Sequence, residues 1–315
     1  MSQARIRRGR SANARAWSLL GWVLVLASSA ILSSGQFIAP HGPLAIALAY
    51  FLGITGCTAG ARCLVRAKRL RALDAHDALA RDPRPPVVYF RPFSADSEAS
   101  RRIVSTSWVT AEEQVATAVN HIGPFVAFGI PRESLPAIGA ARLYEDDARW
   151  QGSARELMER AALVLLRIGS GPSFWWEFTT AVRSVAPQKV VLLIPHDEAL
   201  YWEFRAASVD CLPRALPALR AWHRKKWFRG GLKALIFFDA AWSPSVVDLN
   251  AVHVPWKRFS PNMPLAPILQ MALRPICDNA GLPWIPPKVS RRLFAVIAAT
   301  VVWIASIVVQ IVLAD

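Results

Sequence analysis

Three long uncharged runs stand out in the pattern of apolar and polar positions. They cover residues 17–34, 43–61 and 293–314, and each is long enough to cross the hydrocarbon core of a bilayer as a helix. A short loop joins the first two, which predicts a transmembrane hairpin. A basic N-terminus could instead open a signal peptide, but the first run is long for one and a second run follows at once. We expect three retained spans.

Between the second and third long runs, short apolar runs alternate with amphipathic helical patterns. The strand-like runs cover 87–90, 125–129, 162–169 and 189–195, and the helical patterns cover 111–120, 153–160 and 176–185. This alternation is typical of βαβ units, and continuous apolar strands indicate burial on both faces of a sheet. The sequence therefore predicts an α/β domain built on a parallel sheet with helices on both faces.

These patterns divide the chain into six parts. They are a basic N-terminus (1–16), the hairpin (17–61), a basic helical stalk (62–85), the α/β domain (86–195), a C-terminal extension (196–290) and the third span (293–314). Within the extension, we expect a helix at 198–207, a fifth strand at 234–239 and a closing helix at 266–281.

Positive charge is concentrated beside the long apolar runs. The flanking basic residues are Arg5, Arg7, Arg8, Arg10, Arg15, Arg62, Arg66, Lys68, Arg69, Arg71, Lys288, Arg291 and Arg292. Since basic flanks stay in the cytoplasm, we expect a multi-pass inner-membrane protein with its N-terminus and soluble domain in the cytoplasm and its C-terminus outside. Without these residues, 24 basic residues face 22 acidic ones, a net charge of +2 instead of +15.

Three other classes of function are disfavoured. Residues 220–233 interleave basic and aromatic side chains, a pattern that could bind RNA or DNA, but in a membrane-tethered domain it favours contact with anionic lipid headgroups. No charge interrupts any span, which argues against a transporter or channel. The four cysteines have no metal-ligand spacing, so we expect no metal site.

Candidate site residues gather after the predicted strands, where ligands bind in open α/β sheets. They are Arg91, Phe93, Asp96, Gly129, Arg142, Tyr144, Gly169, Ser170, Ser173, Trp176 and Glu177. Glycines before a helix can hold phosphate through backbone N–H groups, and arginines bind it bidentately. These residues predict a nucleotide site. A structural interpretation stays open for each, with arginines that anchor loops, glycines that permit tight turns and tryptophans that fill the core.

Glu177 follows two tryptophans and a Gly/Pro/Ser turn, and two interpretations of it stay open. An acid in the first turn of a helix gains about 0.3–1 kcal/mol from the helix dipole. Alternatively, a carboxylate beside a ribose would stabilise the oxocarbenium-like transition state of N-glycosidic bond cleavage. A second titratable cluster, residues 196–198, fits a polar turn better than a general base.

Over residues 86–195, the pattern resembles the Toll/interleukin-1 receptor (TIR) superfamily in its divergent bacterial form. The matching stretches are VVYFRPFSAD, FVAFGIPRESLP and ARELMERAALVLLRIGSGPSFWWEFTTAV. In enzymatic members, a glutamate on the helix after the third strand supports cleavage of NAD, and the resemblance maps that role to Glu177. The family places this acid a few residues after a tryptophan, whereas Trp176 and Glu177 are adjacent. The approach to Glu177 is also similar to that of the nucleoside deoxyribosyltransferases, whose acid is a nucleophile on deoxyribose. The resemblance to these two families implies a flavodoxin-like fold.

The resemblance implies a membrane-anchored domain that binds a nucleotide and cleaves its N-glycosidic bond, as in bacterial defence or signalling. NAD would be the substrate and not a resident cofactor, and self-association would assemble the site. The alternative is a non-catalytic signalling or adaptor module that acts by domain association. Such a module needs no pocket at Glu177 and tolerates its replacement.

Overall fold

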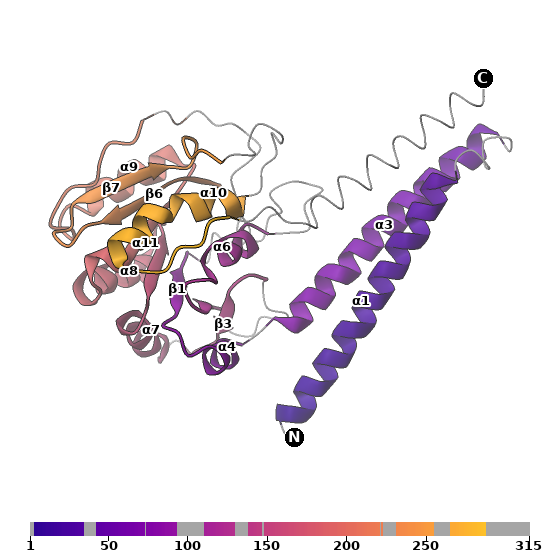
Figure 1. Ribbon diagram of the computed structural model, residues 1–315, viewed down its shortest axis with the longest axis horizontal. Coiled ribbons are helices and arrows are strands. Elements are labelled where there is room, and N and C mark those ends of the chain that lie inside the picture. The colour runs from indigo at the N-terminus through magenta and orange to yellow at the C-terminus, as the bar shows by residue number, and fades with distance from the viewer. Residues whose placement is uncertain are drawn as a thin grey trace. The chain divides into compact units, whose positions relative to one another are not determined.

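The computed structural model describes residues 3–34, 42–72, 74–92, 110–129, 138–146, 148–220, 222, 231–254 and 265–287. The chain divides into two compact units, Met1–Trp284 and Ile285–Asp315. All helices and strands described below belong to the first unit (Figure 1).

Two long helices, α1 (Gln3–Ser33) and α3 (Pro43–Arg71), lie side by side (Figure 1). Glycines make their contact close. A Cβ added to Gly60 would lie 2.8 Å from the Gly21 carbonyl oxygen, and one added to Gly53 would lie 2.5 Å from the Leu32 side chain. Small residues at a helix contact are the usual means by which membrane helices approach each other.

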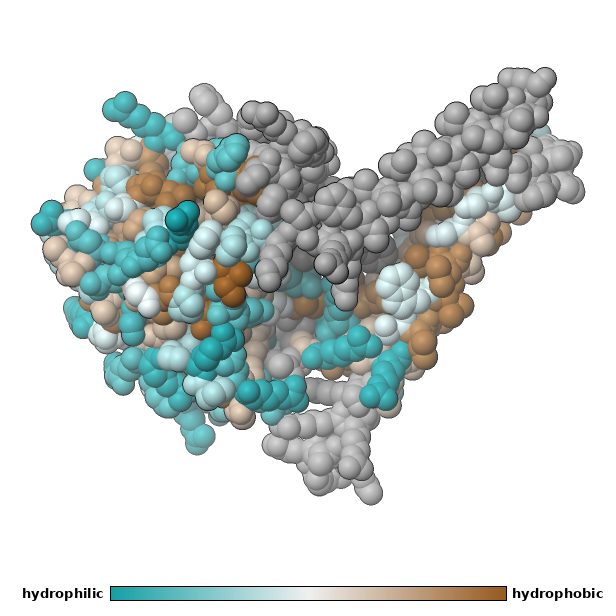
Figure 2. Space-filling model, viewed as in Figure 1, coloured by the Kyte–Doolittle hydropathy of each residue, from teal (hydrophilic) through white to brown (hydrophobic). Residues whose placement is uncertain are grey.

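Both helices of this hairpin are long and apolar enough to cross a membrane. Large apolar side chains point away from their contact: Leu26 is 65% exposed and Leu44 is 82% exposed, and Figure 2 shows this part of the chain in brown. Such a surface is costly in water and suits lipid. The expected third span, residues 293–314, lies outside the described residues, so the described part of the chain contains two candidate spans.

The segment expected to be a stalk, residues 62–85, is divided between two helices. Its first part continues α3 as far as Arg71, and its second part forms the separate helix α4 (Ala75–Arg81). Asp74 caps α4 through its side chain, and Ala75 is fully buried in the core beneath the sheet. Therefore α4 is part of the α/β domain and not of a free stalk.

Seven strands form one mixed sheet in the order β3-β2-β1-β4-β5-β6-β7. Their bounds are β1 Val87–Phe90, β2 Phe125–Phe128, β3 Ala141–Leu143, β4 Leu163–Arg167, β5 Val190–Pro195, β6 Leu232–Phe238 and β7 Pro244–Asp248. The strands from β3 to β5 pair in parallel, whereas β6 and β7 pair antiparallel. The expected fifth strand is therefore present as β6 with the opposite direction, and the C-terminal extension completes the same sheet.

Helices cover both faces of the sheet, as predicted. One face carries α4, α7 (Trp150–Glu159), α8 (Pro172–Ser184) and α9 (Glu198–Ala207), and the other carries α6 (Ala111–Val119), α10 (Leu265–Ala272) and α11 (Arg274–Ala280). Alternate residues of the strands enter the two cores. Thr110 and Glu113 form a capping box at the start of α6, and the expected closing helix is broken into α10 and α11.

The order of the strands fixes where a ligand cleft belongs. From β1 the chain passes through α6 to β2 on one side, and from β4 it passes through α8 to β5 on the other. Because α6 and α8 lie on opposite faces, β1 and β4 are the neighbouring strands at which the winding reverses. Ligands of open α/β sheets bind at this switch point, beyond the carboxyl ends of the strands.

Candidate functional site at the carboxyl edge of the sheet

The loops that leave β1 and β4 meet at this edge. A Cβ at Gly169, two residues after β4, would overlap the ring of Pro92, two residues after β1. Glycine at 169 therefore permits the close approach of the two loops. Phe93 and Asp96, the next candidate residues after β1, lie outside the described residues.

A second close approach involves the next strands along the edge. A Cβ at Gly129 would lie 2.5 Å from Cε1 of Tyr144, so the tyrosine ring lies against the glycine backbone. The structure thereby brings together two candidate residues, Gly129 after β2 and Tyr144 after β3. Arg142 belongs to β3 itself and not to a loop, which corrects the expectation from the sequence.

Glu177 lies in the second turn of α8, not in the first. The helix begins at Pro172 after Gly171, whose φ of 123° is a conformation that favours glycine, and no side chain caps it. Proline is well suited to the first position of a helix, which explains why α8 starts four residues before the predicted helix at 176–185. Ser173 is therefore inside the helix. Because dipole stabilisation fades within the first turn, the helix dipole does not account for Glu177.

The Glu177 side chain is largely buried beside apolar residues. The residue is 8% exposed and lies on the same side of α8 as the buried Phe174 and Phe178. Next to it, Trp176 makes an edge contact with Trp150 of α7, with ring centroids 4.7 Å apart. No hydrogen bond or ion pair links Glu177 to another part of the described chain. Desolvation raises the pKa of Glu177 to about 8, so its protonated form predominates at neutral pH.

Arg91 and Arg142 converge on a carboxylate that the sequence did not single out. Nη2 of Arg142 lies 2.8 Å from the Glu112 carboxylate, and Nη2 of Arg91 lies 3.5 Å from it. The backbone N–H of Ala140 donates to the same carboxylate at 2.9 Å. All three charged side chains are at least nine-tenths buried. They tie the start of α6 to β1 and β3, so both arginines have an internal structural role.

Arg167 adds a third guanidinium to this group. It is the last residue of β4, is 4% exposed and hydrogen-bonds the hydroxyl of Tyr89 on β1. Burial raises the pKa of Tyr89 above its usual value. Among the described residues, Arg91 and Arg142 thus pair with Glu112, and Arg167 contacts Tyr89 on the neighbouring strand, so three guanidiniums gather on the α6 side of this edge.

The candidate residues therefore form two groups on opposite faces of the sheet. Glu177, Trp176 and Ser173 belong to α8, whereas the contacts of Arg91 and Arg142 lead to α6. Gly169 and Ser170 lie between the two faces, in the turn from β4 to α8. One edge of the sheet thus combines the buried, neutral Glu177 with a second group, called the cationic cluster below. Its members are Tyr89, Arg91, Glu112, Arg142 and Arg167.

The polar turn after β5 has a structural role, as expected. The Asp197 side chain accepts a hydrogen bond of 3.0 Å from the backbone N–H of Leu200 and so caps α9. The backbone N–H of His196 donates to the carbonyl of Gly231 at the start of the antiparallel strand.

No protein-family model, curated protein or solved structure matches this chain. A functional assignment therefore rests on the residues and the geometry described above.

Sequence reasoning missed three members of the cationic cluster: Tyr89, Glu112 and Arg167. Arg167 carried a usable signal, because a charge that closes the apolar run LVLLR is unusual in a buried strand. Glu112 carried none, since it precedes the capping glutamate and looks like an ordinary first-turn acid.

Proposed function

We propose that this chain is a membrane-anchored, TIR-like α/β domain that binds a nucleotide at the carboxyl edge between β1 and β4 and cleaves its N-glycosidic bond. NAD is the proposed substrate. The observation that carries the proposal is the Glu177 carboxyl group, buried in an aromatic environment one turn beyond the glycine-rich turn at the switch point. Buried acids with a strongly raised pKa in such positions are frequent among reacting groups.

The chemistry of NAD suits such an acid. Cleavage by water breaks the bond between nicotinamide and ribose and yields nicotinamide, ADP-ribose and one proton. Positive charge moves onto the ribose in the transition state, and a carboxylate in a water-poor site stabilises it strongly. An approaching cationic nicotinamide would favour the ionised form of Glu177 and lower its pKa. Binding of NAD would therefore release a proton from Glu177.

The cationic cluster supports the nucleotide part of the proposal. Three guanidiniums gathered on one face of the sheet would contribute positive potential at the edge where the two loops meet. This potential attracts a diphosphate even where the guanidiniums themselves remain bound to Glu112. The hairpin would hold the domain at the cytoplasmic face of the inner membrane, with neighbouring copies close enough to self-associate.

Turnover of NAD by the full-length protein in detergent or nanodiscs tests the proposal. Nicotinamide and ADP-ribose are separated by chromatography for wild type, Glu177→Gln and the control Glu203→Gln. Glu203 is an exposed acid on α9, so its replacement makes the same chemical change away from the edge. We expect Glu177→Gln to reduce turnover by about a hundredfold or more and Glu203→Gln to leave it unchanged. Equal turnover in wild type and Glu177→Gln would refute the catalytic role.

A non-catalytic adaptor is the second candidate, and the enclosure of Glu177 together with the internal pairing of Arg91 and Arg142 favours it. An adaptor tolerates Glu177→Gln and acts through association between domains. Chemical cross-linking of the protein in membranes measures that association. Unchanged cross-linking in Glu177→Gln, combined with no NAD turnover in wild type at any protein density, would support the adaptor.

A further inference from the structure

A cavity of about 500 Å³ lies at the opposite, amino edge of the sheet, where α3 ends. The ends of α3 and α4 form one side, and α6 together with the starts of β2 and β3 forms the other. Three basic residues line it, Lys68, Arg71 and Arg81, together with two acids, Asp82 and Glu113. The cavity wall adjoins the Glu112 cluster, because the backbone N–H of Ala140 donates to Glu112, but none of Arg91, Arg142 and Glu177 lines the cavity.

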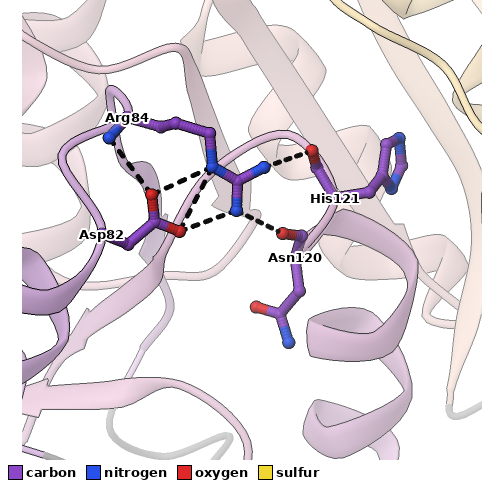
Figure 3. Close-up of polar contacts among 4 residues, drawn as sticks. All are labelled: Asp82, Arg84, Asn120 and His121. Carbon is purple, nitrogen blue, oxygen red and sulfur yellow. Dashed lines mark hydrogen bonds and ion pairs between the residues drawn. The ribbon is translucent and has the colours of Figure 1, made fainter.

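The first acid, Asp82, is neutralised from outside the cavity. Arg84 donates two hydrogen bonds to its carboxylate, from Nε to Oδ1 at 2.9 Å and from Nη2 to Oδ2 at 2.6 Å (Figure 3). The same guanidinium donates to the backbone carbonyls of Asn120 and His121 at the end of α6, at 3.1 and 2.6 Å. Arg84 thus fixes one wall of the cavity and removes the negative charge of Asp82 from it.

The second acid, Glu113, is also occupied. One carboxylate oxygen lies 3.1 Å from Nζ of Lys68, and the other accepts a hydrogen bond of 2.8 Å from the backbone N–H of Thr110 in the capping box. Lys68 and Glu113 therefore cancel each other's charge. The positive charge left in the cavity belongs to Arg71 and Arg81.

Arg71 and Arg81 are exposed, and neither has a hydrogen bond or ion pair with another residue in the described ranges. Each lies in the last turn of its helix, where a cation is favoured by the helix dipole, and basic residues commonly follow a span. These two effects explain why an arginine stands at the end of each helix. They do not explain why both line one cavity whose acids are already neutralised.

We propose that Arg71 and Arg81 form a binding site for a phosphate group in this cavity. Guanidinium groups bind phosphate oxygens through paired N–H donors, and two of them match the charge of a phosphate monoester. The phosphate can belong to an anionic phospholipid, because α3 is a candidate span and this is its basic end, or to a soluble phosphate ester.

Binding to the full-length protein in a neutral detergent tests the site. The probes are a short-chain phosphatidic acid, inorganic phosphate and, as an acyl-chain control, a short-chain phosphatidylcholine, each measured by microscale thermophoresis. The double variant Arg71→Gln/Arg81→Gln is compared with Arg155→Gln/Arg183→Gln, which removes the same charge from exposed positions on α7 and α8. Matching thermal melts by circular dichroism show that both variants fold.

We expect the Arg71/Arg81 variant to bind phosphatidic acid at least about tenfold more weakly than wild type, and the control variant to bind within about twofold of it. Binding of phosphatidic acid alone identifies a lipid headgroup as the source, and binding of inorganic phosphate as well identifies a soluble ester. The proposal is overturned if wild type binds neither probe, or if both double variants lose the same affinity.

Discussion

Replacement of Glu177 by glutamine should change how the stability of the α/β domain depends on pH. Burial raises the pKa of this carboxyl from 4.5 to about 8. Between these values the folded protein retains a proton that the unfolded chain has released. The stabilising effect of the neutral acid is thus complete below the unfolded pKa and is lost as pH rises through about 8.

The size of the effect follows from the proton balance. Each pH unit in this interval lowers the free energy of unfolding of wild type by about 1.4 kcal/mol relative to Glu177→Gln, since glutamine does not titrate. Between about pH 5 and about pH 7 the difference between the two proteins should therefore change by about 3 kcal/mol, with the variant gaining. Other titrating groups are common to both proteins and cancel in the difference.

Urea unfolding of the solubilised full-length protein, followed by tryptophan fluorescence at several pH values, measures this difference. Glu203→Gln is the matched control, because it makes the same chemical change at an exposed position. A pH-independent difference between wild type and Glu177→Gln would show that the carboxyl group titrates normally. Glu177 would then not be a neutral acid in the folded protein.

Three further substitutions test other parts of the structure. Gly60→Leu should destabilise the hairpin by about 1–3 kcal/mol or more, because the Gly21 carbonyl occupies the space beside it. The control Ala47→Leu, at an exposed position of the same helix, should not destabilise it. Thermal melts of the solubilised protein distinguish the two variants. Glu112→Gln should cost about 3–5 kcal/mol in urea unfolding, since two buried guanidiniums lose their counter-charge, and a loss below about 1 kcal/mol would contradict this. Asp197→Ala should cost about 1 kcal/mol by the same measurement, whereas Asp197→Asn keeps the cap and should cost little.

Elements with a strong local signal could be predicted from the sequence. The strand at 87–90 has the predicted bounds, as does the helix at 198–207. In each, the local pattern of apolar residues and the tertiary packing favour the same structure. The antiparallel direction of β6 could not be read from its residues, because an apolar run is equally compatible with both directions.

The contacts within the candidate site could not be predicted from local sequence patterns. β3 was missed because it has three residues with an arginine at its centre, and that arginine is buried only because Glu112 lies opposite it, thirty positions earlier in the chain. Similarly, the sequence does not show that α8 begins at Pro172. Because it begins there, Glu177 lies in the second turn, where the helix dipole no longer stabilises an acid. Pairings distant in the sequence decide which charges face each other, and a single sequence does not display them.

The buried arginine of β3 also has a mechanical consequence. Arg142 forms a β-bridge with Asp74, the cap of the first helix after α3, and its guanidinium holds the carboxylate that Arg91 shares at the carboxyl edge. Load applied along α3 is thus carried through Asp74 into β3 and from there to the loop after β1. Close-packed protein interiors transmit strain. The end of the candidate membrane hairpin is thereby linked to the edge of the sheet through one backbone β-bridge and the two ion pairs of Glu112 with Arg142 and Arg91.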